Sequence, residues 1–135
     1  MKKRYLKQLT IALLLMATLL FVGCRTAPIY SVTDAPVNTN VENHTAEDVK
    51  KAILRAGAGL GWHIKESGPS QLIGTLHLRK HMAKIDIPYS RDGYSLLYSD
   101  SNELKYNPDK REIHKNYNGW IQNLDQAIQS HLMGL

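Results

Sequence analysis

The chain has only one cysteine, Cys24, so no disulfide bond can form within it and packing alone must hold the fold. It also lacks an apolar run long enough to span a bilayer. The uncharged stretch 9–23, as a helix, reaches about 22 Å, whereas the hydrocarbon core is ~30 Å thick. No G-x-S-x-G motif occurs, which excludes the nucleophile elbow of the α/β-hydrolases.

Long blocks of like charge are missing as well, once the first seven residues are set aside. Four of the seventeen Lys and Arg residues lie in 1–7, so the rest of the chain is nearly neutral although the formal net charge is +5. Proteins that bind nucleic acid usually carry a concentrated basic stripe. The charge distribution therefore predicts no nucleic-acid partner.

The first 24 residues have the layout of an export signal, with the basic segment 1–7 followed by the apolar segment 9–23. The sequence LFVGC at 20–24 resembles the lipobox of bacterial lipoproteins. That resemblance implies removal of residues 1–23 and acylation of Cys24 on its thiol and its freed amine. The alternative is an uncut signal with a free thiol, which would leave an unpaired cysteine in an oxidising compartment.

The lipobox also implies a location and a mode of attachment. Two or three acyl chains, at about 0.8 kcal/mol for each buried CH₂, hold a protein to a membrane essentially permanently. Among such lipoproteins an Asp after the cysteine favours the inner membrane, and Arg25 stands there instead. We therefore expect the membrane to be contacted through acyl chains on Cys24, at the periplasmic face of the outer membrane.

Residues 24–44 have no apolar period, and several prolines and asparagines interrupt them. They are interpreted as the lipidated cysteine and an extended tether that lifts the domain away from the membrane. An edge strand formed by the short apolar group Ile29, Tyr30 and Val32 is the alternative. The globular domain is then predicted over residues 45–135, which suffice for one domain and not for two.

Helical periodicity marks both ends of this domain. Thr45 is a plausible N-cap for a helix over 46–59, whose apolar residues recur every three or four positions. Gly57, Gly59 and Gly61 near its end are interpreted as sites of close packing and of a left-handed turn. A second amphipathic stripe runs from Tyr117 to Leu132.

Between the helices, apolar and polar residues alternate in the manner of strands. The alternating segments are WHIKE at 62–66, QLIGTLHLRK at 71–80, a run over 81–89 and a run from Tyr94 to Ser99. Short links predict an antiparallel meander. ELKY and REIHK, on either side of Asn107, are expected to form either a short extended pair or irregular chain. The expected fold is α+β, a single small domain with about four strands in the order α-β-β-β-β-α.

A broader resemblance covers nearly the whole region after the signal. The segments AGLGWHI, RKHMAKIDIPYS, YSLLYSDSNELKY and IHKNYNGWIQNL are similar to a group of small proteobacterial lipoproteins whose activity is unassigned. The resemblance implies an anchor and a single domain. It supplies no catalytic residues.

Several groups of residues are candidate sites by residue type and spacing. His77, Arg79 and His81 are spaced by two, but a zinc site would also need ligands such as His63, His114 or Asp86. Exposed polar chain is the simpler interpretation. Two acid pairs, Glu47 with Asp48 and Asp100 with Glu103, are better explained by helix capping and a turn than by glycoside cleavage. Neither a metal, nor a cofactor, nor a catalytic residue is therefore assigned.

Aromatic residues gather in the second half of the chain, where rings are able to stack on sugars. Most are predicted to belong to the core or its rim. The residues are Tyr89, Tyr94, Tyr98, Tyr106, Tyr117 and Trp120. The asparagines of NYNGWIQN at 116–123 are expected to satisfy the helix start and nearby backbone groups. If they stay exposed, they form a candidate partner surface. We expect a non-enzymatic interaction domain with an envelope protein as partner. The alternatives are a glycan- or small-ligand-binding module and, third, a hydrolase.

Overall fold

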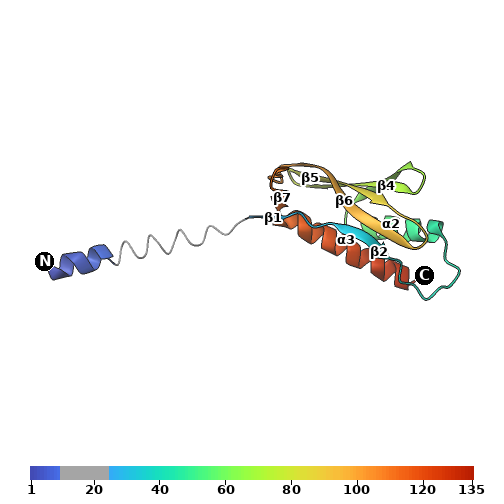
Figure 1. The fold of residues 1–135 in the computed structure, drawn as a ribbon, viewed down its shortest axis with the longest axis horizontal. Helices are drawn as coiled ribbons and strands as arrows, with labels where there is room; N and C mark the ends of the chain where they lie inside the picture. Colours follow the sequence, from blue (N-terminus) through green and yellow to red (C-terminus); the bar gives the residue numbers. More distant parts are fainter. Residues whose placement is uncertain (10–24) are drawn as a thin grey trace.

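The computed structural model describes residues 1–9 and 25–135, and Cys24 lies outside the described residues. Residues 25–135 form one α+β domain with helices against an antiparallel sheet (Figure 1). Its strands are β1 (Thr26–Pro28), β2 (Val32–Pro36), β3 (His63–Gly68), β4 (Gln71–Leu78), β5 (His81–Pro88), β6 (Gly93–Asn102) and β7 (Glu112–His114). Its helices are α2 (Ala46–Gly59) and α3 (Lys115–Met133).

The predicted helix 46–59 is confirmed as α2, and its start is fixed by a capping box. The Thr45 hydroxyl accepts from the backbone N–H of Asp48, and the Asp48 carboxylate accepts from the backbone N–H of Thr45. At the other end Gly61 adopts a φ of 83°, a conformation that glycine reaches without strain. A side chain at Gly57 would collide with Ile64, so this glycine permits close packing of α2 on β3.

The main sheet has the order β2-β6-β5-β4-β3, and every neighbouring pair in it is antiparallel. Four of these strands, β3 to β6, follow one another as the predicted meander. The prediction of about four strands is thus confirmed in topology, and β2 adds a fifth strand at the edge beside β6.

Residues 25–44 are less free than the predicted tether. Val32 is buried and pairs with Leu96, which confirms the edge-strand alternative for this residue. β1 pairs with β7 through Thr26 opposite His114. Periodicity does not predict β1, and it offers β2 only as an alternative, because the partners of both strands lie far along the chain. Only residues 37–45 connect β2 to α2 without strand pairing.

Asn118 on α3 holds the segment between β1 and β2 in place. Its Oδ1 accepts a hydrogen bond from the backbone N–H of Tyr30, and its Nδ2 donates to the carbonyl of Pro28, both at 2.9 Å. One side chain therefore satisfies two backbone groups on a strand edge that would otherwise need water.

The core lies between the sheet and the two helices, which cover the same face of it (Figure 1). Alternate residues of β4 and β5 point into it, which produces the strict buried and half-buried pattern of those strands. From α2 and α3 come the apolar stripes that were predicted, Val49, Ala52, Ile53 and Ala56, and Tyr117, Ile121, Leu124, Ile128 and Leu132.

The segment between β6 and α3 resolves the open interpretation of ELKY and REIHK. Within REIHK, Glu112–His114 form β7, which pairs with β1 and also contacts ELKY, because the backbone N–H of His114 donates to the carbonyl of Leu104 at 2.8 Å. An isolated bridge between Asn107 and Glu112 closes the intervening turn. Three residues of this segment, Glu103, Lys105 and Arg111, take left-handed φ angles between 51° and 58° without being glycine. The loop 103–111 is therefore a compact, locally strained structure.

Candidate functional site

Two hollows at the β1 end of the domain are lined by aromatic, charged and polar side chains that are able to bind a ligand. The aromatic pocket, about 370 Å³, is lined by Ile29, Ser31, Leu97, Tyr98, Tyr106, Pro108 and Arg111. The basic pocket, about 510 Å³, is lined by Arg25, Lys80, His81, Glu103, Lys105 and His114. The loop 103–111 contributes to both, so its conformation shapes the two pockets together.

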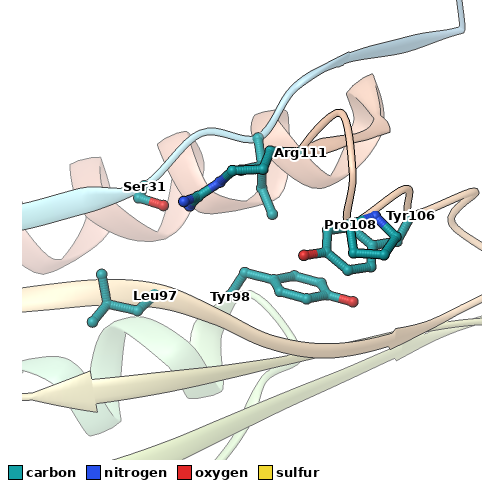
Figure 2. A pocket seen from close by; sticks show the side chains of 7 residues that line it. Ser31, Leu97, Tyr98, Tyr106, Pro108 and Arg111 are labelled. Carbon is teal, nitrogen blue, oxygen red and sulfur yellow. The ribbon is translucent and has the colours of Figure 1, made fainter.

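The floor of the aromatic pocket is a pair of tyrosine rings. Tyr98 of β6 and Tyr106 of the loop have ring centroids 4.2 Å apart and planes inclined by 31° (Figure 2). The Tyr98 hydroxyl forms a hydrogen bond of 2.8 Å with Ser101. Burial raises the pKa of the Tyr98 phenol above its usual value of 10, so the ring stays neutral at physiological pH. The pocket therefore offers π surface without negative charge.

Arg111 supplies the positive charge of the aromatic pocket. Its carbonyl accepts from the backbone N–H of Ile29 at 2.9 Å, which ties the loop to the segment after β1. Its side chain extends toward Ser31 (Figure 2). Within residues 1–9 and 25–135, no carboxylate lies within ion-pair distance of its guanidinium. Rings, hydroxyl and guanidinium together suit a small ring-bearing ligand with an anionic group.

The basic pocket is assembled from four separate parts of the chain. Arg25 precedes β1, Lys80 and His81 lie at the β4–β5 turn, Lys105 is in the loop, and His114 ends β7. The one acid, Glu103, has a carboxylate oxygen 3.8 Å from Lys80 Nζ, with both side chains more than half exposed. Such a pair is weak in water, so the pocket keeps an excess of positive charge.

His81 is fixed in one tautomer when neutral. Its Nδ1 lies 2.8 Å from the carbonyl oxygen of Glu103, and a carbonyl only accepts, so Nδ1 carries the hydrogen. The ring lies near that of Trp120, with centroids 6.5 Å apart. Its Nε2 atom is therefore the one left for a ligand.

His114 has the opposite tautomer because it is the N-cap of α3. Its Nδ1 accepts from the backbone N–H of Asn116 at 3.2 Å, which leaves Nε2–H as a donor. Burial lowers the pKa of His114 below its usual 6.5, and the positive charges around it lower that pKa further. Those charges come from His81, Lys105, Arg25 and Lys115.

The histidine and acid groups proposed from spacing do not form a site in the described chain. A turn at Arg79, with a φ of 56°, separates His77 from His81, so they lie on different strands. No cluster of three His, Cys, Asp or Glu residues able to hold a metal is found in residues 1–9 and 25–135. Asp100 lies in β6 and not in the predicted turn: it pairs with Lys84 next to an irregularity in the β5–β6 register, and its carboxylate accepts from the backbone N–H of Ser101.

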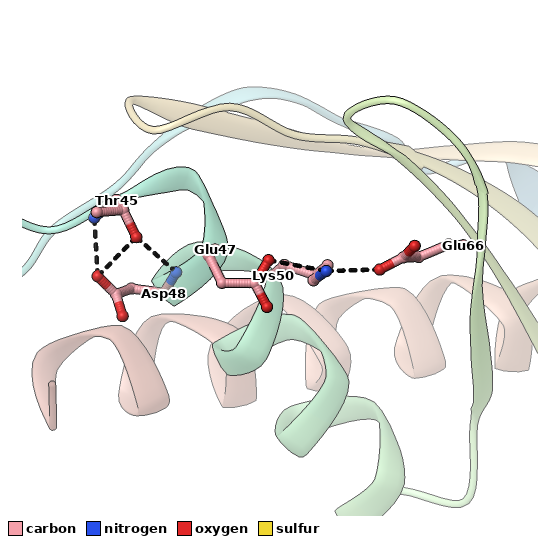
Figure 3. Close-up of polar contacts among 5 residues, drawn as sticks. All are labelled: Thr45, Glu47, Asp48, Lys50 and Glu66. Atoms are coloured by element: carbon pink, nitrogen blue, oxygen red, sulfur yellow. Dashed lines mark hydrogen bonds and ion pairs between the residues drawn. The ribbon is translucent and has the colours of Figure 1, made fainter.

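Glu47 and Asp48 serve the start of α2, as the capping interpretation predicted (Figure 3). Asp48 completes the capping box, and Glu47 forms an ion pair of 2.8 Å with Lys50. Lys50 also reaches Glu66 of β3 at 2.5 Å (Figure 3). The two carboxylates raise the pKa of Lys50, whose side chain is 16% exposed. These acids are occupied by structural roles.

The aromatic residues divide largely as predicted. Tyr94 and Tyr117 are buried in the core, and Tyr89, Tyr98 and Trp120 pack against it. Tyr106, at 36% exposure, is the open ring of the set.

Within the sequence NYNGWIQN, only some residues remain available to a partner. Asn116, Gln122 and Asn123 are exposed, whereas Asn118 is committed to the β1–β2 segment. The candidate partner surface at 116–123 therefore keeps these three exposed polar side chains, which line a hollow together with Asn118, Gly119 and Trp120.

Sequence reasoning missed the basic pocket and the role of Arg111. Arg25, Lys80, Lys105 and His114 are separated by long stretches of chain, and no local pattern connects them. The sequence feature that could have pointed to this pocket is the position of Arg25, which immediately follows the predicted lipidation site.

Comparisons with protein-family models, curated proteins and solved structures give no match to this chain. Within the described part of the chain, no helix has both the length and the apolarity needed to cross a membrane. The features that bear on function are therefore the two pockets and the predicted anchor at Cys24.

Proposed function

We propose that this chain is a lipid-anchored envelope protein whose folded domain binds a partner or ligand at the membrane surface. Cys24 carries the acyl chains, residues 1–23 are the signal, and the anchor lies in the outer membrane facing the periplasm. The domain acts by binding and not by catalysis, with an envelope protein as the first candidate partner.

One observation carries the membrane-surface part of this proposal. β1 begins at Thr26, and its pairing with β7 fixes residue 26 opposite His114. The backbone N–H of Lys115 also donates to the carbonyl of Arg25 at 3.0 Å. The folded domain thus starts one residue after the proposed lipid attachment. Acyl chains at that point hold the β1 end of the domain against the bilayer.

A binding role is supported by what the candidate acids already do. Glu47 and Asp48 are committed to α2, and Glu103 is set among positive side chains in the basic pocket. General acid–base chemistry needs a convergent pair of titratable groups aimed at one reacting atom. The aromatic pocket instead presents rings, a hydroxyl and a guanidinium, which are groups suited to holding a ligand. In the basic pocket the Nδ1 atoms of His81 and His114 are already hydrogen-bonded to the backbone at Glu103 and Asn116, and cations outnumber the one carboxylate.

The anchor is tested by labelling cells that express the full chain with radioactive palmitate. The wild type should incorporate label, and Cys24→Ser should lose it completely and remain unprocessed. Ser130→Ala, an exchange at the far end of α3, is the control and should label as the wild type does. Persistent label in Cys24→Ser would refute the anchor assignment.

Location is tested separately by density-gradient separation of the two membranes. The wild type should sediment with the outer membrane. Arg25→Asp introduces the residue that favours inner-membrane retention among similar lipoproteins, so this variant should move to the inner-membrane fraction. A wild type found mainly in the inner membrane would contradict the proposed sorting.

The aromatic pocket favours a second function, the binding of a glycan or small ligand. Tyr98 and Tyr106 provide stacked rings, and Arg111 has an uncompensated guanidinium among the described residues. Sugars bind to proteins by stacking on aromatic rings, and a guanidinium selects a carboxylate through paired hydrogen bonds. The pocket therefore predicts preference for an acidic sugar over a neutral one.

This second function is tested by NMR titration of the detergent-solubilised full chain with glucuronic acid and with glucose. Glucuronic acid should perturb the Tyr106 and Arg111 resonances at lower concentration than glucose. Tyr106→Ala should remove that response, whereas Leu60→Ala, at a similarly exposed position outside the pocket, should keep it. Equal responses to the two sugars would remove the role assigned to Arg111.

A further inference from the structure

The basic pocket lies at the point where the chain meets its proposed anchor. Arg25 lines this pocket and is joined by a single peptide bond to Cys24. Consecutive Cα atoms are about 3.8 Å apart, so acyl chains on Cys24 begin next to the wall of the pocket. β1 and β7 lie at one end of the domain and the C-terminus lies at the other (Figure 1). An anchored domain therefore turns this pocket, and not its opposite end, toward the lipid headgroups.

The charges in the pocket match the chemistry of that surface. Arg25, Lys80 and Lys105 bring three cations, and Glu103 is the one carboxylate in the lining. Bacterial membranes expose phosphodiesters, and basic groups close to such a surface are attracted to them. A guanidinium binds phosphate through two parallel hydrogen bonds, and an ammonium binds it as a point charge.

We propose that the basic pocket binds the phosphate of an anionic phospholipid headgroup in the leaflet that carries the anchor. This inference rests on the proposed lipid anchor, because the anchor delivers the pocket to the headgroups. Arg25 and Lys105 neutralise the phosphate, and the Nε2–H of His114 donates to one of its oxygens. The acyl chains then fix the distance of the domain from the bilayer, and the bound headgroup fixes its orientation.

His114 reports on occupancy because burial and, after it, the surrounding positive side chains hold its pKa down. The charged groups that face it are His81 on β5, Lys105 in the loop, Arg25 before β1 and Lys115 on α3. A phosphate among them offsets their charge and raises the pKa of His114. His131 is an internal control, since it lies seventeen residues beyond His114 on α3, or about 26 Å at 1.5 Å per residue. That distance exceeds the Debye length of about 8 Å at physiological salt.

The experiment uses the full lipidated chain, purified in detergent and reconstituted into nanodiscs. One set contains phosphatidylcholine alone, and a second contains equal parts of phosphatidylcholine and phosphatidylglycerol. A third set contains phosphatidylcholine with inorganic phosphate in the buffer, which separates a free ion from a lipid headgroup. The titration midpoints of His114 and His131 are followed by NMR of histidine-labelled protein.

We expect the midpoint of His114 to rise in the phosphatidylglycerol discs while that of His131 stays unchanged. The pocket variant Arg25→Gln with Lys105→Gln should lose this rise. The control variant Lys51→Gln with Arg55→Gln removes the same charge from α2, outside the pocket lining, and should keep it.

Three results would overturn the assignment. The midpoint of His114 could be the same in both lipid compositions, or the pocket variant could retain the full rise. Inorganic phosphate could raise the midpoint in the phosphatidylcholine discs while the phosphatidylglycerol discs show no rise, which would make the site one for a free ion. Failure of the anchor is recognised separately, because an unlipidated chain would not co-elute with discs of either composition and its intact mass would show a bare thiol.

Discussion

Removing the hydroxyl group from either of two buried tyrosines should change the free energy of unfolding, but in opposite directions. Tyr94 and Tyr117 are both 2% exposed or less. The Tyr94 hydroxyl donates to Asp125 at 2.5 Å and accepts from Gln129 at 2.9 Å. The Tyr117 hydroxyl has no hydrogen-bond partner among the described residues. Phenylalanine keeps each ring in place, so the exchange isolates the hydroxyl.

The sign of each effect follows from what the hydroxyl gains on folding. A buried polar group without a partner costs about 1–3 kcal/mol of desolvation, while a hydrogen bond to a charged group stabilises by about 1.5–3 kcal/mol. Tyr117→Phe should therefore raise the free energy of unfolding by about 1 kcal/mol, after allowance for the dispersion contacts of the lost oxygen. Tyr94→Phe should lower it by about 2 kcal/mol, because Asp125 loses a donor.

The assay is thermal unfolding of the purified full chain at pH 7, followed by near-ultraviolet circular dichroism. Burial raises the pKa of both phenols, so ionisation does not enter the comparison at this pH. For a domain near 100 residues, 1 kcal/mol corresponds to a shift in Tm of about 4 °C. Tyr117→Phe should melt above the wild type and Tyr94→Phe below it. A Tyr117→Phe protein that melts as low as Tyr94→Phe would refute the reasoning.

Two further predictions concern α2. Gly57→Ala should destabilise the fold by about 1–3 kcal/mol, because the new methyl group collides with Ile64, whereas Gly59→Ala meets open space and should stabilise it by about 0.5 kcal/mol. Thermal melts decide between these signs, and similar melting points would contradict them. Hydrogen bonds from Thr45 hold the pKa of Asp48 below its ordinary 3.8, so the capping box stabilises above about pH 4 and is lost as the pH falls. The difference in Tm between wild type and Asp48→Asn should shrink over that fall, and a constant difference would exclude the capping role.

The elements that sequence predicted well are those whose signal is local. Thr45 and Asp48 lie three residues apart, and the apolar stripe of α2 repeats within its own length. The alternation in β4 and β5 is likewise contained in each strand and its neighbour. Period and capping therefore predicted both helices and the meander without information from distant residues.

The elements that sequence missed depend on contacts between distant segments. β1 has three residues and no periodicity, and it exists because β7 pairs with it some ninety positions away. The asparagines of 116–123 are predicted to satisfy nearby backbone or, if exposed, to bind a partner. Asn118 does the former, but the backbone groups that it satisfies, at Pro28 and Tyr30, lie some ninety positions away. The pockets are still harder to predict from sequence. Loop 103–111 brings their walls together through residues with left-handed φ angles, which no rule of composition predicts.

The pairing of β1 changes the range over which an anchored domain can act. A free tether over 24–44, fully extended at about 3.3 Å per residue, would let the domain reach roughly 70 Å from the bilayer. With residue 26 paired to β7, the reach becomes that of the domain itself, and α3, at 19 residues and 1.5 Å per residue, is about 28 Å long. Confinement to so thin a layer raises the effective concentration toward membrane-bound partners and removes access to distant ones. An anchor on Cys24 therefore favours a partner that is itself at the membrane, within about 30 Å of the headgroups, over one deep in the periplasm.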